Sequence, residues 1–254
     1  MTSTTVGKIV AILPARWGST RLPGKPLIDI QGLPLIERVR RQVLQSQLVN
    51  EVLVATDDMR IFDTVVSYGG NAALTSTNHH SGTDRLAEVV GKRDDIAIAV
   101  NVQGDEPLID PKAIDAAIQP LIDFPNIEMA TIACPVVNGN VGNANTVKVV
   151  VDNQGFALYF SRAAIPFVRE GQGSYLHHAG LYVYRRHTLL KLSTLPPSKL
   201  ELAESLEQLR ALENGIRIRV VQTSYRPQEV NVNTDIAAVE AYLSALAQGI
   251  SPSF

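Results

Sequence analysis

The sequence predicts an α/β fold of three layers, in which a mixed, mostly parallel central sheet lies between two layers of helices. Strand and helix patterns alternate four times before residue 123, which is typical of parallel βαβ units. Residues 9–13 and 96–102 are almost wholly apolar, as expected of strands buried on both faces. After residue 129, strand-like runs follow one another without helices. This change favours antiparallel additions to the sheet, or a small subdomain.

Hydrophobic periodicity places the elements in order. The expected strands are residues 9–13, 51–56, 72–75, 96–102, 129–137, 146–151, 156–160, 178–184 and 217–221. The expected helices are residues 34–47, 85–91, 111–122, 200–212 and 236–247, with one more after Asp57 and Asp58, which we expect to cap it. No repeat or long linker interrupts this order, so residues 1–254 are predicted to form a single domain with a β-rich lobe over about 129–215.

Composition excludes several classes of protein. Hydrophobic residues make up 45% and charged residues 19% of 254 residues, as in an ordinary soluble globule. The net charge of −2 gives no global basic field, which argues against nucleic-acid or membrane-surface partners. Cys134 is the only cysteine, so no intrachain disulfide forms. Neither a signal-peptide pattern nor a run of about eighteen apolar residues is visible. We therefore expect a cytoplasmic protein.

The segment after the first predicted strand is rich in cations, glycine and proline. Arg16, Arg21 and Lys25 fall within ten residues, together with the hydroxyl groups of Ser19 and Thr20. Open α/β sheets bind ligands at the carboxyl ends of their strands. Arginine presents a rigid fork of donors to phosphate oxygens, and lysine a compact charge. The pattern predicts a polyphosphate-binding loop.

Other interpretations of this loop remain open from its charge alone. A solvated basic loop without a ligand is equally consistent with the composition. A Walker-type loop needs two glycines five residues apart followed by Lys-Ser or Lys-Thr. Here Gly18 and Gly24 are six apart and Pro26 follows Lys25, which excludes that motif. The dinucleotide fingerprint G-x-G-x-x-G is also missing after the strand.

The same segment resembles a family signature. Residues 13–16 (Leu-Pro-Ala-Arg) and 21–27 (Arg-Leu-Pro-Gly-Lys-Pro-Leu) are similar to the signature of sugar nucleotidyltransferases, and in detail to that of 3-deoxy-manno-octulosonate cytidylyltransferases. The likeness continues, in the family's order, through residues 81–89, 100–107, 158–162 and 206–210. The resemblance implies a nucleotide-diphospho-sugar-transferase-like, Rossmann-like fold. It also implies a homodimer that converts CTP and 3-deoxy-D-manno-octulosonate to CMP-Kdo and diphosphate for lipopolysaccharide biosynthesis.

The resemblance also implies roles for individual residues. The catalytic residues would be Arg16, Lys25 and Asp105. The CTP-binding residues would be Ala15, Arg16, Ser19, Arg21, Lys25, Ser81 and Gly82. The residues that bind the acidic eight-carbon sugar would be Arg85, Gln103, His178, Tyr182, Glu207 and Gln208. His178 and Tyr182 lie four apart on a predicted strand, so their side chains share a face. The spacing of His79, His80 and His187 predicts no metal site.

The expected cofactor is Mg²⁺. Asp105 follows a buried strand, where capping a turn would by itself explain an acid, but Mg²⁺ on a nucleotide needs only one or two carboxylates besides phosphate oxygens. The resemblance implies that Asp105 binds the metal. The family's second metal ligand is an Asp in the segment Val-Asp-Thr-Pro-Glu-Asp, and Asn233 stands at that position here. Asp235 is the competing candidate, although capping of the last helix would explain it.

Alternative functions remain open at this point. CMP transfer to a related acid sugar, 8-amino-Kdo or an N-acylneuraminate, would use the same chemistry. A nucleotide-binding regulator with impaired catalysis would also fit, and the amide at Asn233 is the feature that favours it.

Overall fold

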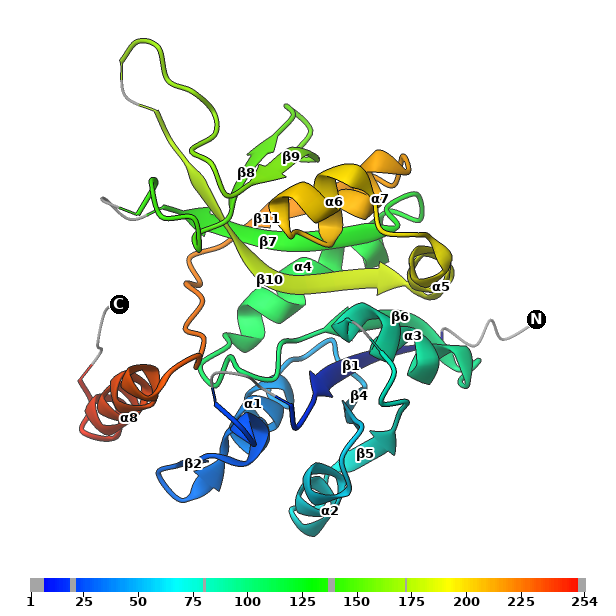
Figure 1. The fold of residues 1–254 in the computed structure, drawn as a ribbon, viewed down its shortest axis with the longest axis vertical. Helices are drawn as coiled ribbons and strands as arrows, with labels where there is room; N and C mark the ends of the chain where they lie inside the picture. Colours follow the sequence, from blue (N-terminus) through cyan, green and yellow to red (C-terminus); the bar gives the residue numbers. More distant parts are fainter. Residues whose placement is uncertain (1–6, 19–21, 80, 137–139, 172, 251–254) are drawn as a thin grey trace.

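A twisted sheet with strand order β11-β7-β10-β6-β1-β4-β5 forms the centre of the protein (Figure 1). The computed structural model describes residues 7–18, 22–79, 81–136, 140–171 and 173–250. The strands on this path are β1 (Lys8–Ala15), β4 (Glu51–Thr56), β5 (Asn71–Leu74), β6 (Ile96–Asn101), β7 (Met129–Pro135), β10 (Leu176–Arg185) and β11 (Ile218–Gln222). The pair β8 (Lys148–Val151) and β9 (Ala157–Ser161) extends from β10. A separate hairpin joins β2 (Asp29–Ile30) to β3 (Leu33–Pro34).

The sheet is mixed and mostly parallel, which confirms the predicted fold class. β10 runs antiparallel to both of its neighbours on the path, β6 and β7. The other neighbouring pairs on the path are parallel. β7, β10 and β11 therefore continue the central sheet, as the antiparallel-addition interpretation expected. The boundaries of the β-rich lobe over 129–215 stay a prediction.

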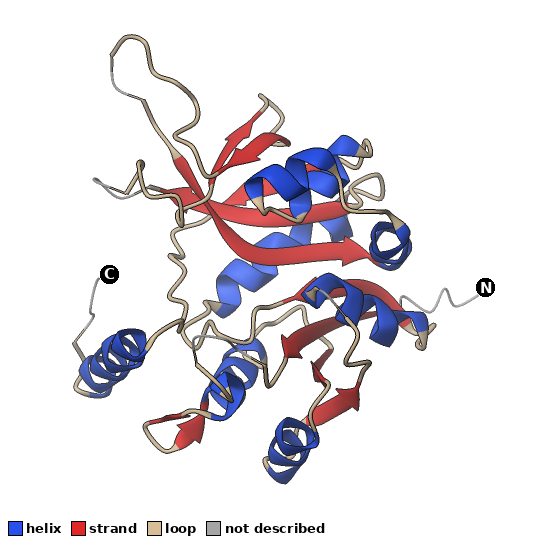
Figure 2. Ribbon diagram, viewed as in Figure 1, coloured by secondary structure: helices blue, strands red, loops and turns tan. Residues whose placement is uncertain are grey.

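Helices cover both faces of the sheet, giving the predicted three layers (Figure 2). One apolar core contains residues of α1 (Leu35–Val43), α2 (Met59–Ser67), α4 (Pro111–Asp123) and α8 (Asn233–Ala247). The other contains residues of α3 (Gly82–Gly91), α5 (Arg186–Thr194) and α7 (Gln208–Glu213), with α6 (Lys199–Glu204) just before α7. Along β1, Ala11 and Leu13 belong to the first core, whereas Val10 and Ile12 belong to the second. This alternation buries β1 on both faces, as its apolar run predicted.

Two local predictions were wrong. The single helix over 200–212 is broken into α6 and α7, because Ser205 adopts a left-handed conformation with φ 51°. As a result Leu202 is 67% exposed, whereas Leu206 is buried. Of the two acids expected to cap α2, only Asp58 does so, accepting from the amide of Arg60. Asp57 instead forms an ion pair of 2.7 Å with Arg85.

A buried histidine joins β10 to β7. The Thr131 hydroxyl donates its single proton to the carbonyl of Leu181 at 2.7 Å, so it accepts from Nε2 of His178 at 3.0 Å. Burial lowers the pKa of His178 to about 3. His178 is therefore a neutral imidazole in the folded protein at pH 7.

This histidine predicts a pH dependence of stability. Its pKa is lower in the folded than in the unfolded chain, where histidine titrates near 6.5, so its contribution is complete above that pH and is lost on acidification toward 3. We expect the free energy of unfolding to fall by about 2 kcal/mol from this group at pH 5. Urea denaturation at pH 7 and pH 5 should show a smaller loss in His178→Gln. The control is His187→Gln, at a histidine whose side chain is 65% exposed. Equal losses in wild type and His178→Gln would contradict the prediction.

Candidate active site

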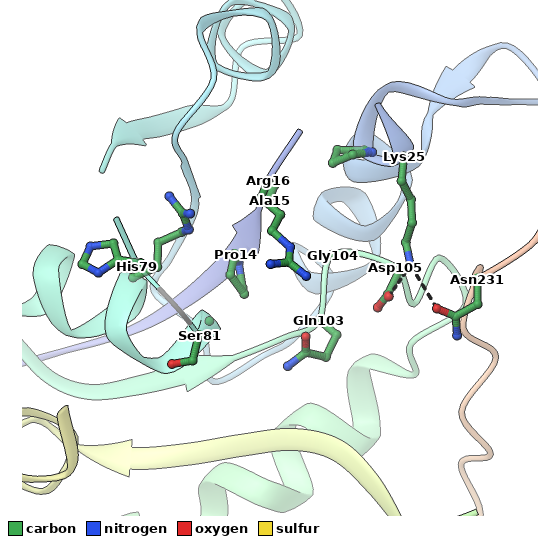
Figure 3. A pocket seen from close by; sticks show the side chains of 13 residues that line it. Pro14, Ala15, Arg16, Lys25, His79, Ser81, Gln103, Gly104, Asp105 and Asn231 are labelled. Carbon is green, nitrogen blue, oxygen red and sulfur yellow. Dashed lines mark hydrogen bonds and ion pairs between the residues drawn. The ribbon is translucent and has the colours of Figure 1, made fainter. Parts of the chain in front are cut away.

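The main pocket opens at the carboxyl ends of β1 and β6. From β1 the chain proceeds to β4 and β5 on one side of the sheet and then returns to β6 on the other, which makes this the switch point at which open α/β sheets bind ligands. The cavity has a volume of about 320 Å³. Its lining residues are Pro14, Ala15, Arg16, Lys25, Pro26, His79, Ser81, Gly82, Arg85, Gln103, Gly104, Asp105 and Asn231 (Figure 3).

Two loops meet closely at the floor of this pocket. A Cβ atom at Gly104 would lie 2.9 Å from the carbonyl oxygen of Pro14, so only glycine lets the loop after β6 approach the end of β1 so closely. This approach places Asp105 opposite Lys25, which begins the short 3-10 helix Lys25–Leu27. The loops are joined by an ion pair of 2.6 Å between Lys25 Nζ and Asp105 Oδ2.

Asn231 completes this charged end. Its Oδ1 lies 3.3 Å from Lys25 Nζ, and its Nδ2 donates to a Glu229 carboxylate oxygen at 2.8 Å. These two contacts fix the orientation of the amide, so the oxygen faces Lys25. Figure 3 shows Lys25, Asp105 and Asn231 together at one end of the pocket. A carboxylate oxygen and an amide oxygen thus converge on one positive charge.

This donor set fits Mg²⁺. The ion takes hard oxygen ligands, with one or two protein groups supplemented by substrate phosphates and water. The described residues contain no group of three or more His, Cys, Asp and Glu able to hold a metal. Asp105 and Asn231 would therefore form a site that is complete only with nucleotide phosphate oxygens.

The two candidates for the second metal ligand lie apart from the pocket lining. Asn233 is the first residue of α8 and is exposed. Asp235 accepts from the backbone amides of Asn231 at 2.7 Å and Val232 at 2.8 Å, which is a capping role. The structure brings Asn231, which the sequence reasoning missed, into the pocket beside Asp105. The only signal for it was a second asparagine two residues before Asn233.

The opposite end of the pocket is less charged. Ser81 caps α3 by accepting from the amide of Asp84 at 3.1 Å. His79 pairs through Nε2 with Glu88 at 2.6 Å. Arg85 is only 3% exposed, and its guanidinium is fixed by Asp57 and Thr75. Figure 3 shows His79 and Ser81 on the side away from Lys25, with Arg16 between the two ends.

Five of the six residues predicted to bind the sugar line two cavities, and the sixth, His178, lies beside one of them. Arg85 and Gln103 line the main pocket. Tyr182, Glu207 and Gln208 line a second cavity of about 20 Å³. His178 lies next to Tyr182, with ring centroids 5.3 Å apart, although a bulge interrupts the pairing of β10 with β7 between them.

Glu207 and Gln208 each have a buried polar atom without a hydrogen-bond partner among the described residues. Glu207 accepts from the Thr83 hydroxyl at 2.8 Å, and burial raises the pKa of its carboxyl group. The atoms without such a partner are Glu207 Oε1 and Gln208 Nε2. Because buried polar atoms are nearly always paired, these two atoms are available to bind a ligand or water.

Glu106 is another buried acid near the pocket, and unlike Glu207 it was not predicted from the sequence. Tyr225 donates to its Oε2 at 2.6 Å. Burial raises the pKa of Glu106 to about 8, so the carboxyl group is mostly protonated at pH 7. The acid next to Asp105 thus adds little negative charge. Its position in Gln-Gly-Asp-Glu-Pro was the signal for it in the sequence.

The predicted CTP-binding residues Ser19 and Arg21 lie outside the described residues. On either side of them, the amide of Gly24 donates to the carbonyl of Trp17 at 3.2 Å. The Arg60 guanidinium lies 3.3 Å from the centre of the Trp17 ring, a cation–π contact. Trp17 is the only tryptophan of the chain, so its fluorescence reports on this loop.

Comparison with known proteins identifies the family. The cytidylyltransferase family model matches residues 10–218. The chain is 49% identical over 242 residues to the 3-deoxy-manno-octulosonate cytidylyltransferase of Trichlorobacter lovleyi, with 90% of this chain and 96% of the relative covered. It is 48% identical over 244 residues to that of Geobacter sulfurreducens, with 91% and 97% covered.

Solved structures agree with this result. A CMP:2-keto-3-deoxy-manno-octonic acid synthetase in complex with CTP matches with a TM-score of 0.91 at 43% identity, covering 94% of this chain and 99% of that one. The 4-diphosphocytidyl-2C-methyl-D-erythritol synthase of Anaerococcus prevotii, at 15% identity and a TM-score of 0.62, covering 94% and 99%, shares the fold. This chain therefore belongs to the 3-deoxy-manno-octulosonate cytidylyltransferases.

Proposed function

We propose that this protein transfers CMP from CTP to 3-deoxy-D-manno-octulosonate, giving CMP-Kdo and diphosphate. The observation that carries the proposal is the joined pair Lys25 and Asp105 at the switch point of the sheet, in a chain 43% identical to a synthetase solved with CTP. The substrate that fits the charged end is a triphosphate. The less charged end around Ser81 and Gly82 fits the base.

The mechanism follows from charge and position. Arg16 and Lys25 would bind the triphosphate and neutralise the charge that develops on the departing diphosphate. Lys25 would exchange its carboxylate partner for phosphate oxygens, which frees Asp105. The anomeric hydroxyl of the sugar would be held in line with the α-phosphorus, and this positioning supplies much of the rate enhancement. Asp105 and Asn231 would hold Mg²⁺, which would supply further positive charge to the triphosphate.

The sugar would lie toward β10 and α7. Glu207 Oε1 can accept from a hydroxyl group and Gln208 Nε2 can donate to one, and both are buried without a partner among the described residues. Tyr182 lines the same cavity. Kinetic competition among Kdo, 8-amino-Kdo and an N-acylneuraminate identifies the preferred acid sugar.

We also propose that the protein is a homodimer and acts in the cytoplasm. The family resemblance implies a homodimer, and the exposed apolar side chains of Phe167 (88%) and Leu158 (62%) are candidate contact residues for it. The described part of the chain contains no helix long and apolar enough to cross a membrane. The free thiol of the buried Cys134 fits a reducing compartment such as the cytoplasm, where we place this step of lipopolysaccharide biosynthesis.

The phosphate-binding role predicts large losses of turnover. Arg16→Ala and Lys25→Ala should each lower kcat by roughly two to three orders of magnitude, because each removes a preorganised charge from the transition state. Diphosphate release from CTP with Kdo measures this. The matched control is Lys8→Ala at the other end of β1, where Lys8 pairs with Glu51 and Asp95. Near-normal turnover in both test variants would exclude the loop as the triphosphate site.

The metal site predicts a graded response to Mg²⁺. Asp105→Asn should abolish turnover at ordinary Mg²⁺, since it removes the only carboxylate of the proposed site. Asn231→Ala should raise the Mg²⁺ concentration for half-maximal activity about tenfold, which corresponds to loss of about 1.4 kcal/mol of binding. Asn231→Asp should lower it.

The controls for the metal site are Asn233→Ala and Asp235→Ala. On the structural assignment, neither should shift the Mg²⁺ requirement as far as Asn231→Ala. A dominant effect of Asn233→Ala would restore the sequence-based assignment, and a dominant effect of Asp235→Ala would favour its competitor.

Dimerisation is tested by light scattering of the purified protein. We expect twice the chain mass of 27.6 kDa. Phe167→Asp should shift the equilibrium toward monomer because it places a charge on an apolar contact. Monomeric wild-type protein at micromolar concentration would refute the dimer.

A further inference from the structure

The turn between α6 and α7 contains a residue in an unfavourable backbone conformation. Ser205 has φ 51° and ψ 50°, a left-handed conformation that is unfavourable for a residue with a Cβ atom. Leu206 is buried directly after it, and Glu207 and Gln208 follow. The position of these two polar side chains therefore depends on how firmly the turn is held.

The Arg162 guanidinium holds this turn from outside. Its Nε donates to the carbonyl of Glu204 at 2.7 Å, and its Nη2 to the carbonyl of Ser205 at 3.2 Å. Carbonyls at the end of a helix lack partners within the helix. A third donor, Nη1, contacts the carbonyl of Ala144 at 3.0 Å. The planar arginine fork holds its donors in fixed and separate directions, so Nε, Nη1 and Nη2 contact all three carbonyls at once.

Arg162 is itself fixed on its other sides. The Glu204 carboxylate accepts from the backbone amide of Arg162 at 2.9 Å and from the Ser161 hydroxyl at 2.6 Å. The carbonyl of Arg162 accepts from Lys148 Nζ at 2.5 Å, and Lys148 is completely buried. Lys148 also donates to the carbonyl of Thr146 at 2.6 Å. Arg162 thus connects the end of β9 to the α6–α7 turn, and we call this set of hydrogen bonds the Arg162 bracket.

We propose that Arg162 is a positioning residue for the acidic-sugar half of the site, acting through the Ser205 turn on Glu207 and Gln208. This inference rests on the proposed function, because it takes these two side chains as sugar contacts. Arg162 is not among the residues that line the main pocket or the small cavity. Because Arg162 contacts the α6–α7 turn and not the nucleotide pocket, its removal should weaken sugar binding and leave CTP binding unchanged.

The test compares Arg162→Ala with Arg217→Ala. Arg217 also bridges surface elements, through Asp152 and Phe156, but does not contact the α6–α7 turn. Arg162→Ala should raise the KM for Kdo about tenfold, while the Kd for CTP, followed by Trp17 fluorescence, stays within twofold of wild type. Arg217→Ala should leave both constants unchanged. If Arg162→Ala does not fold, Arg162→Lys keeps the charge with fewer contacts and should shift the KM in the same direction.

A rescue variant separates positioning from general destabilisation. Glycine adopts the left-handed conformation freely, so adding Ser205→Gly to Arg162→Ala should recover part of the KM for Kdo. An unchanged KM in folded Arg162→Ala, a parallel rise in the Kd for CTP, or no recovery in the double variant would overturn the proposal.

Hydrogen exchange gives a readout that does not depend on the substrate. Amides of residues 205–210 should exchange faster in Arg162→Ala than in wild type or Arg217→Ala. Unchanged exchange would show that Arg162 does not stabilise the α6–α7 turn and would overturn the proposal. If wild-type protein released no diphosphate with Kdo while exchange responded as expected, the proposed function would fail and the Arg162 bracket would stand.

Discussion

The ion pair between Lys25 and Asp105 is the interaction on which the site depends. It links the segments that follow two adjacent parallel strands, β1 and β6, across 2.6 Å. The two side chains are only 15% and 23% exposed, so salt screens their attraction less than that of a surface pair. Without a ligand, each charge satisfies the other. In the proposed mechanism, the phosphate oxygens of CTP would take the place of Asp105 on Lys25, and Asp105 would then be free to hold Mg²⁺.

Two ionisable side chains near this ion pair add little charge to it. Glu106, next to Asp105, is buried and mostly neutral at pH 7, so it adds little negative charge beside the Asp105 carboxylate. Arg85 is committed to Asp57 and Thr75 rather than to the acids at the Lys25 end. On the proposed sugar side, Glu207 and Gln208 follow the left-handed residue Ser205, whose carbonyl accepts from Arg162.

The parts that could be predicted from sequence are those encoded locally. Apolar runs identified β1 and β6, and punctuation by Gly and Pro marked the loops that line the pocket. Tertiary contacts decided the rest. Asp57 binds an arginine 28 residues away, and Asn231 meets a lysine 206 residues away. The break at Ser205 contradicts a continuous leucine period, because carbonyl contacts from Arg162 stabilise a conformation that local propensity disfavours. The metal ion itself stays a prediction from donor chemistry.

The exchange of Asp105 for phosphate on Lys25 is tested most directly by a crystal structure of the protein with a non-hydrolysable CTP analogue and Mn²⁺, with the metal located by anomalous diffraction. We expect an anomalous peak within bonding distance of Asp105 and a phosphate oxygen, with Lys25 Nζ moved from Asp105 to a phosphate oxygen. A structure in which the nucleotide is bound while Lys25 remains paired with Asp105 and the metal lies elsewhere would contradict this expectation.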